Sequence, residues 1–242
     1  MPNPPKRFSH LEWRDEPPRR LGAGDFLRLK AHWARNVYED GTTSRWYQVE
    51  SVWPPFLDAV VLLLYHRPRA GEPLVCLRRS IRPAITLRQN QPALRQLDRA
   101  SFAGEFWELP AGGVEPPDLA NGPAGLRKCA RREAWEEAGL ELGEEAFAEL
   151  GEAPFSAPAM CTERLHYLAA EVDPDQARPP EGDGHPMEEG AEIRFLALSA
   201  ALAWCRQGKI LDTKTELGLW RLGQWLGQPP CGSGLPGQGE EA

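Results

Sequence analysis

The sequence predicts an α/β fold preceded by a small antiparallel β-subdomain. A near-continuous apolar run at residues 58–66 is typical of a strand that is buried on both faces. Short strand-like pieces alternate between residues 26 and 52, as in an antiparallel meander. Further along, four apolar residues recur every four positions and predict a helix that lies against a sheet: Leu126, Ala130, Ala134 and Ala138.

Length and composition are those of a globular protein. The 242 residues suffice for one sizeable domain with a small extension, and 41% hydrophobic with 26% charged residues is ordinary. With a net charge of −7, nothing in the composition suggests broad electrostatic binding to a nucleic acid polymer. The longest apolar run, residues 59–65, is far too short for a membrane span. We therefore expect neither nucleic acid nor membrane as a partner.

The cysteines and the first residues indicate a cytoplasmic protein. The five cysteines are scattered and include no Cys-x-x-Cys pair, which is typical of reduced thiols. Residues 1–18 are rich in proline and charge and lack the apolar core of a signal peptide.

The chain divides by composition into four parts. Residues 1–24 carry five prolines and are predicted to be disordered or an arm. Residues 25–55 form the β-subdomain, with strands at 27–30, 33–38 and 45–50 and an Asp40-Gly41 turn. Because such a meander is too small to be stable alone, it should pack on the main body or a second subunit.

The main domain is predicted at residues 56–228, and a Gly/Pro-rich disordered tail follows at 229–242. Residues 84–100 are expected to be a loop with partial helix, and Pro179–Gly190 an acidic loop. The expected strands are 58–66, 74–77, 106–109, 148–155, 165–172 and 193–198. The expected helices are one that begins near Pro123 and ends at Gly139, one capped by Ser199, and one at 213–226.

Three acidic residues on the first helix carry the strongest functional signal. Glu133, Glu136 and Glu137 stand at i, i+3 and i+4, so they share one patch near the helix C-terminus. The like charges and the helix dipole both disfavour this arrangement, and Arg132 can offset only one carboxylate. A hard divalent cation would offset all three. The alternative is a solvated acidic helix face.

The order of these residues resembles the signature box of the Nudix hydrolases, Gly-x5-Glu-x7-Arg-Glu-hydrophobic-x-Glu-Glu-x-Gly-hydrophobic. Ala134 stands at the first hydrophobic place, and the C-terminal half also matches at Arg132, Glu133, Glu136, Glu137, Gly139 and Leu140. The N-terminal half departs from the pattern. Between Gly113 and Arg132 lie 18 residues where the box has 13, and Ala124 stands where the spacing requires Glu. We interpret residues 115–123 as an enlarged loop.

The resemblance implies an α/β/α Nudix sandwich with a mixed sheet, preceded by the small antiparallel β-subdomain. Residues 108–112, Glu-Leu-Pro-Ala-Gly, resemble the box entry of the ADP-ribose (ADP-sugar) pyrophosphatase branch, whose members are commonly dimers. By the same resemblance, Mg²⁺ or Mn²⁺ would be held by Glu133, Glu137 and the Ala111 carbonyl, with Glu136 as a further candidate ligand. Because the metal would take part in the reaction, Glu137 is also predicted to be a catalytic residue. A homodimer is expected.

A second loop supplies the candidate for activating water. Residues 158–163 resemble the Pro-Gly-x-x-x-Glu loop of the ADP-ribose hydrolases, with Ala159 in place of Gly. The resemblance implies that Glu163 binds metal or activates the attacking water. The alternative is that Glu163 is an ordinary surface acid.

The candidate substrate-binding residues are Arg78, Arg79, Arg82, Trp46 and Glu108. The arginines follow a buried strand, and a guanidinium can bind a phosphate at two points. They could equally form salt bridges to nearby acids. Trp46 and Tyr47 could stack on a purine or pack at a dimer interface, and Glu108 opens the box entry.

Together these features predict metal-dependent hydrolysis of a nucleoside diphosphate sugar, with ADP-ribose first, giving AMP and ribose 5-phosphate. The alternatives are GDP-mannose, UDP-glucose, a dinucleotide, or a sensor that binds ADP-ribose without cleaving it. In the enlarged loop, Glu115 and Asp118 are the acids available to replace the missing box Glu. The simpler hypothesis is a solvated loop without a role.

Overall fold

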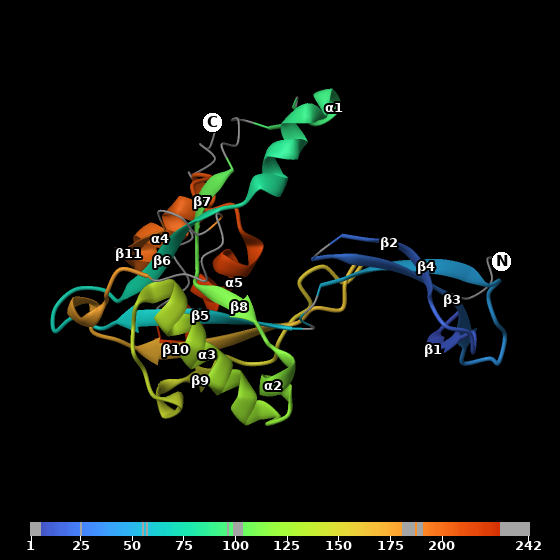
Figure 1. Cartoon of the computed structure of the whole chain (residues 1–242), viewed down its shortest axis with the longest axis horizontal. Helices are drawn as coiled ribbons and strands as arrows, with labels where there is room; N and C mark the ends of the chain where they lie inside the picture. The colour runs from blue at the N-terminus through green and yellow to red at the C-terminus, as the bar shows by residue number, and fades with distance from the viewer. Residues whose placement is uncertain are drawn as a thin grey trace, which may run out of the picture. The chain divides into compact units, whose positions relative to one another are not determined.

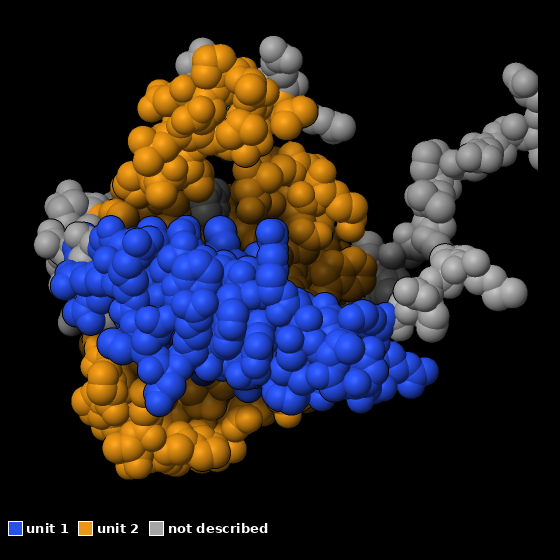
Figure 2. All heavy atoms as spheres, turned by 90° about the vertical axis from the view of Figure 1, so that its right-hand side faces the viewer, with its two compact units in different colours: residues 1–58, 155–164 blue, residues 59–154, 165–242 orange. Residues whose placement is uncertain are grey.

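The computed structural model describes residues 6–24, 26–54, 56, 58–95, 97–98, 104–180, 187 and 191–227. The chain forms two compact units, one of residues 1–58 and 155–164 and the other of residues 59–154 and 165–242 (Figure 2). The predicted tail at 229–242 and most of the predicted loop Pro179–Gly190 lie outside the described residues.

The first unit is built on a four-stranded antiparallel sheet. β3 (Arg28–Tyr38) pairs on one edge with β1 (Phe8–Trp13) and β2 (Arg19–Ala23), and on the other with β4 (Tyr47–Trp53). Because residues 8–13 and 19–23 are strands, the prediction of a disordered segment or arm at 1–24 is wrong for them. Their prolines, Pro17 and Pro18, fall between the strands, where they cost no ladder hydrogen bond.

Two details distinguish this unit from the predicted meander. The strands expected at 27–30 and 33–38 are one continuous strand, β3. The segment 155–164, far along the chain, joins the unit: the Val52 amide donates to the Met160 carbonyl at 2.8 Å, and the Arg164 amide to Asp58 Oδ1 at 3.2 Å. The predicted Asp40-Gly41 turn is confirmed, because Gly41 has a φ of 78° that favours glycine.

The second unit contains a seven-stranded mixed sheet (Figure 1). Its main order is β11 (Glu192–Ala197), β6 (Leu74–Ile81), β5 (Ala59–His66), β10 (Leu165–Glu171) and β9 (Ala148–Glu149). β5 and β10 are parallel, and the other pairs are antiparallel. β7 (Glu105–Glu108) pairs with β6, and β8 (Ala111–Gly113) pairs with β5.

Helices cover both faces of this sheet because β5 is apolar on both. Val60, Leu62 and Leu64 face α3 (Pro123–Ala138) and pack with its residues Ala130, Ala134 and Ala138. Val61, Leu63 and Tyr65 share the other core with α4 (Leu198–Arg206) and α5 (Thr213–Trp225). The predicted α/β/α sandwich with a mixed sheet is confirmed.

The remaining elements are short. A 3₁₀ helix η1 (Pro83–Asn90) and α1 (Pro92–Arg95) occupy the predicted loop at 84–100, and α2 (Pro116–Leu119) lies in the enlarged loop. Two further 3₁₀ turns are η2 (Glu144–Ala146) and η3 (Pro174–Gln176). The predicted strand at 148–155 shortens to β9. Ser199 does not cap α4, since Ala197 holds that place and Ser199 bonds Glu72.

No helix among the described residues is long and apolar enough to cross a membrane.

Candidate active site

The position of the acidic residues depends on where α3 begins and ends. Pro123 begins the helix, and Gly139 ends it with a φ of 62°, as predicted. A Cβ at Gly139 would lie 2.0 Å from the Arg178 carbonyl oxygen, so close packing also requires glycine there. The apolar stripe faces the sheet and places Glu133 and Glu137 at the edge of the buried face, where both are buried.

Glu137 is held from two directions. One carboxylate oxygen, Oε2, accepts a hydrogen bond from the Ala111 amide at 2.7 Å. The other, Oε1, is ion-paired with Nη1 of Arg78. Glu137 is 7% exposed and Arg78 only 2%, so this ion pair is screened little by water. Arg78 was predicted to bind phosphate, but its observed partner is Glu137, because its side chain turns into the protein from β6.

Glu133 lies against the backbone of β8. A Cβ at Gly112 would stand 1.9 Å from the carboxylate carbon of Glu133, so only glycine leaves room for it. Burial, and then the neighbouring charge of Glu137, raise the pKa of Glu133 to about 8, although Arg132 opposes this shift. Arg132 Nη1 lies 2.6 Å from Glu133 and 3.2 Å from Glu136. The positive charge of Arg132 therefore does not fully offset the cost of burying Glu133 in its charged form.

The donor atoms at this place fit a hard divalent cation. Carboxylate oxygens of Glu133 and Glu137 beside the β8 backbone are the oxygen ligands that Mg²⁺ and Mn²⁺ prefer. Among the described residues, no three His, Cys, Asp or Glu side chains converge on one point that would hold a metal. Each of the three helix acids instead pairs with an arginine.

A second charged cluster lies at the end of β7. Glu108 is buried, and its oxygens lie 2.5 Å from Arg82 Nη2 and 2.6 Å from Lys214 Nζ. Burial alone would raise the pKa of Glu108, but Lys214 and Arg82 lower it below its ordinary value. Glu108 therefore stays charged and orients Arg82, whose side chain is 40% exposed. A positioning role suits Glu108 better than the predicted direct contact with substrate.

The third predicted arginine points elsewhere. Arg79 is half-exposed and lies 3.7 Å from Glu105 and 3.6 Å from Glu192, both partly exposed. Because side chains alternate along a strand, Arg79 lies on the face opposite Arg78. The structure therefore brings Arg82, and not the whole arginine cluster, to solvent beside Glu108.

Glu163 and Trp46 belong to the first unit, while the helix acids belong to the second. Glu163 is part of a tight loop, since its carbonyl accepts from the Ser156 amide at 3.0 Å. Trp46 is flanked by guanidinium groups, with Arg14 5.0 Å and Arg35 4.8 Å from its ring centre. Their assignment to the active site stays a prediction.

The profile of the NUDIX domain matches residues 59–226. The chain belongs to the NUDIX family. This match spans the helix acids, β8 and the Glu108 cluster. Members of this family are hydrolases that generally use divalent metal ions, which agrees with the oxygen donors around Glu133.

Known relatives and structures are similar over different lengths. The chain is 39% identical to a GDP-mannose pyrophosphatase of Citrobacter koseri over 194 residues, covering 80% of this chain and 78% of that protein. A GDP-mannose pyrophosphatase of Escherichia coli K12 is 38% identical over 111 residues, or 43% of this chain and 56% of that protein. The crystal structure of an ADP compounds hydrolase is 14% identical, covers 92% of this chain and 97% of that chain, and superposes with a TM-score of 0.58. That likeness shows the fold.

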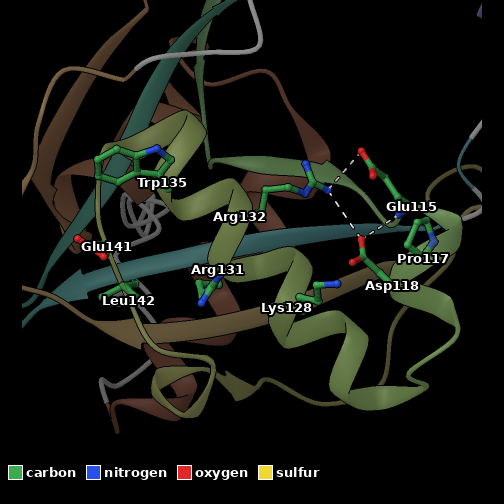
Figure 3. Close-up of a pocket in the computed structure, with 9 residues that line it drawn as sticks. All are labelled: Glu115, Pro117, Asp118, Lys128, Arg131, Arg132, Trp135, Glu141 and Leu142. Carbon is green, nitrogen blue, oxygen red and sulfur yellow. Dashed lines mark hydrogen bonds and ion pairs between the residues drawn. The ribbon is translucent and has the colours of Figure 1, made fainter.

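The helix of this Nudix domain also borders an open cavity of about 560 Å³ (Figure 3). Its lining includes Lys128, Arg131 and Trp135 together with Glu115 and Asp118 of the enlarged loop. Glu133 and Glu137 do not line it, so this hollow lies beside the acidic patch of α3 and not over it.

One residue of the charged cluster around Glu108 in the Nudix domain, Lys214, could not be identified from the sequence. Lys214 neutralises Glu108 and also lies 2.7 Å from Asp212, which caps α5 by accepting from the Thr215 amide. The Thr215 hydroxyl in turn accepts from the Leu109 amide at 2.8 Å. The pattern Asp212-x-x-Thr215 predicts a helix cap. The hydrogen bond from Lys214 to Glu108 joins residues 106 positions apart, so no local pattern predicts it. Arg78 was predicted as a phosphate ligand, and its pairing with Glu137 was not predicted.

Proposed function

We propose that this chain hydrolyses the pyrophosphate bond of a nucleoside diphosphate sugar with a divalent cation, Mg²⁺ or Mn²⁺. One observation carries the proposal: two buried carboxylates, Glu133 and Glu137, lie together against the β8 backbone. Buried carboxylates of like charge are costly unless a cation or a special task compensates them. The proposed ligands are Glu133, Glu137 and the Ala111 carbonyl, with Glu136 at the exposed edge.

The chain's own residues divide the work as follows. Arg78 and the Ala111 amide orient Glu137, and Arg132 orients Glu133. Arg82, set by Glu108 and Lys214, binds a phosphate oxygen through its exposed guanidinium. When bound, a divalent cation would neutralise charge on the pyrophosphate and acidify the attacking water. On the resemblance of its loop, Glu163 is the residue that would orient or deprotonate that water. From the sequence, Trp46 is proposed either to stack on the base or to pack at the dimer interface.

The identity of the sugar nucleotide rests on two lines of support. The resemblance to the ADP-ribose branch predicts ADP-ribose, cleaved to AMP and ribose 5-phosphate. The similarity to a GDP-mannose pyrophosphatase over 80% of the chain favours GDP-mannose as a second candidate. We propose a homodimer as well, supported by apolar side chains exposed on the first unit: Phe8, Trp13 and Phe26.

A substrate panel tests the proposal. ADP-ribose, GDP-mannose, UDP-glucose and a dinucleotide are each incubated with Mg²⁺ or Mn²⁺ and alkaline phosphatase, and released phosphate is measured. An intact diphosphate diester resists phosphatase, whereas the monoester products do not. We expect one sugar nucleotide to be preferred and its turnover to be lost when neither Mg²⁺ nor Mn²⁺ is added. Absence of turnover with every substrate and both metals would refute the proposal and favour a ligand-binding module.

Glu163→Gln tests the general base. We expect kcat to fall by roughly 10²–10⁴-fold with little change in KM, since the proton transfer is made in the transition state. The matched control is Glu145→Gln, which removes an exposed carboxylate from the second unit and should leave both constants unchanged. A rise confined to KM would make Glu163 a substrate-positioning residue instead.

A further inference from the structure

We propose that the cavity on the outer face of α3 is a second nucleotide-binding site, which holds a nucleoside monophosphate with its base on Trp135 and its phosphate between Lys128 and Arg131. The inference goes beyond the proposed function, because this ligand binds outside the candidate active site. It does not depend on that function either, since binding is measured without turnover.

The cavity has the size of a small-molecule site. Its volume is about 560 Å³, within the range of about 300–1,000 Å³ that is usual for ligand pockets. A second hollow of about 450 Å³ adjoins it, because Trp135 and Glu141 line both. Both hollows lie within the second unit, and Glu133 and Glu137 line neither of them. The cavity is therefore separate from the buried carboxylates of the candidate active site.

Trp135 supplies an aromatic surface where the two hollows meet. Its side chain is only partly buried, and the Arg178 guanidinium lies 5.8 Å from its ring centre. Arg178 is fixed at the end of α3, because its amide donates to the Gly139 carbonyl at 3.0 Å. Arg178 lines the smaller hollow and not the cavity, so the ring is supported from the smaller hollow and also borders the cavity. A planar base can stack on a ring that is held in this way.

Lys128 and Arg131 supply positive charge along the same side of the helix. They precede Trp135 by seven and four residues, so the three side chains follow one another along one face of α3 (Figure 3). Both cations are exposed, and within the described part of the chain neither forms an ion pair or a side-chain hydrogen bond. Arg131 is about 6 Å from Trp135 along the helix axis. Because one ribose separates the base of a nucleotide from its phosphate, a base on Trp135 places the phosphate near these two free cations.

The acids that line the cavity do not cancel this charge. Glu115 and Asp118, from the enlarged loop, each lie 3.9 Å from Arg132, so a cation stands beside both. Glu141 is the third acid of the lining, and the two free cations outnumber it. The lining therefore keeps a positive end, where a guanidinium can bind a phosphate at two points. A neutral or cationic ligand would leave both free cations without a partner.

Binding of AMP to the full chain without divalent cation tests this site, with isothermal titration calorimetry as the measurement. All variants carry Arg82→Gln, which removes the proposed phosphate ligand of the active site. We expect this chain to bind AMP, and to bind adenosine or inorganic phosphate more weakly. Trp135→Leu should lower the AMP affinity about 5–150-fold, the effect of losing one stacked base.

Arg131→Gln should also weaken AMP binding, because it removes one of the two phosphate ligands. Its matched control is Arg127→Gln, which removes an exposed positive charge from the same helix outside the cavity and should leave the affinity unchanged. A chain with Arg82→Gln alone that binds no AMP would overturn the inference, as would adenosine that binds as tightly as AMP. Unchanged affinity in a folded Trp135→Leu protein would refute the stacking. Should that variant not fold, the exposed Arg131→Gln decides, and equal affinities in it and in Arg127→Gln would refute the site.

Discussion

Glu137→Gln is expected to lower turnover of the preferred sugar nucleotide by roughly 10²–10⁴-fold, the range for loss of a catalytic group. The amide cannot supply the negative charge that a divalent cation requires. The loss should persist at saturating metal, and turnover under those conditions is the measurement. Glu141→Gln, an exposed acid just past the helix end, is the matched control and should keep normal turnover.

The same substitution should also destabilise the fold. From the sequence, removing one of three repelling charges was expected to leave folding intact. The structure changes that expectation, because Glu137 compensates the charge of Arg78, which is buried beside it. Breaking a buried ion pair from one side costs about 3–5 kcal/mol. A folded Glu137→Gln protein with normal turnover would contradict the metal-site assignment, and an unchanged melting temperature would contradict the importance of the ion pair.

Glu133→Gln should have the opposite effect on stability in metal-free protein. The pKa of Glu133 is raised from an ordinary 4.5 to about 8, chiefly by burial and then by Glu137. Between these values the folded state binds a proton that the unfolded state does not, so the free energy of unfolding falls as pH rises. Each pKa unit corresponds to about 1.4 kcal/mol, so the total is a few kcal/mol.

Urea denaturation in EDTA at pH 5, 6.5 and 8 measures this effect. Gln has no proton to lose, so the variant should lack the fall and exceed wild type in stability at pH 8. The difference between the two proteins isolates Glu133 from other groups that titrate in this range. A wild-type stability that rises with pH relative to the variant would show that Glu133 is charged and satisfied without metal. Turnover of the variant should nevertheless be strongly reduced.

The orientation and the C-terminal end of α3 could be predicted from local spacing alone. The four-residue repeat of alanines fixed which side of α3 faces the sheet, and this places Glu133 and Glu137 together at its edge. Gly139 correctly predicted where the helix ends. The two-sided apolar strand β5 indicated helices on both faces of the sheet. These signals lie within one element, so periodicity and capping preferences reveal them.

The partners of these acids could not be predicted in the same way. Arg78 is 59 residues from Glu137 in sequence, and the pairing depends on which face of β6 meets α3. The prolines before residue 24 suggested disorder, yet β1 and β2 of this segment pair with β3. The segment 155–164 joins the first unit only through contacts with residues about 100 positions earlier.

The sequence by itself determined the family, the acidic helix and the oxygen chemistry of the site, because these depend on residue types at fixed local spacing. The tertiary structure alone decided which charges compensate one another. In the folded protein, Glu137 forms an ion pair with Arg78, Glu108 with Lys214, and Asp118 with Arg132. The physical reason is that an ion pair forms where sheet register and helix packing bring two side chains together, and that register is a property of the whole fold.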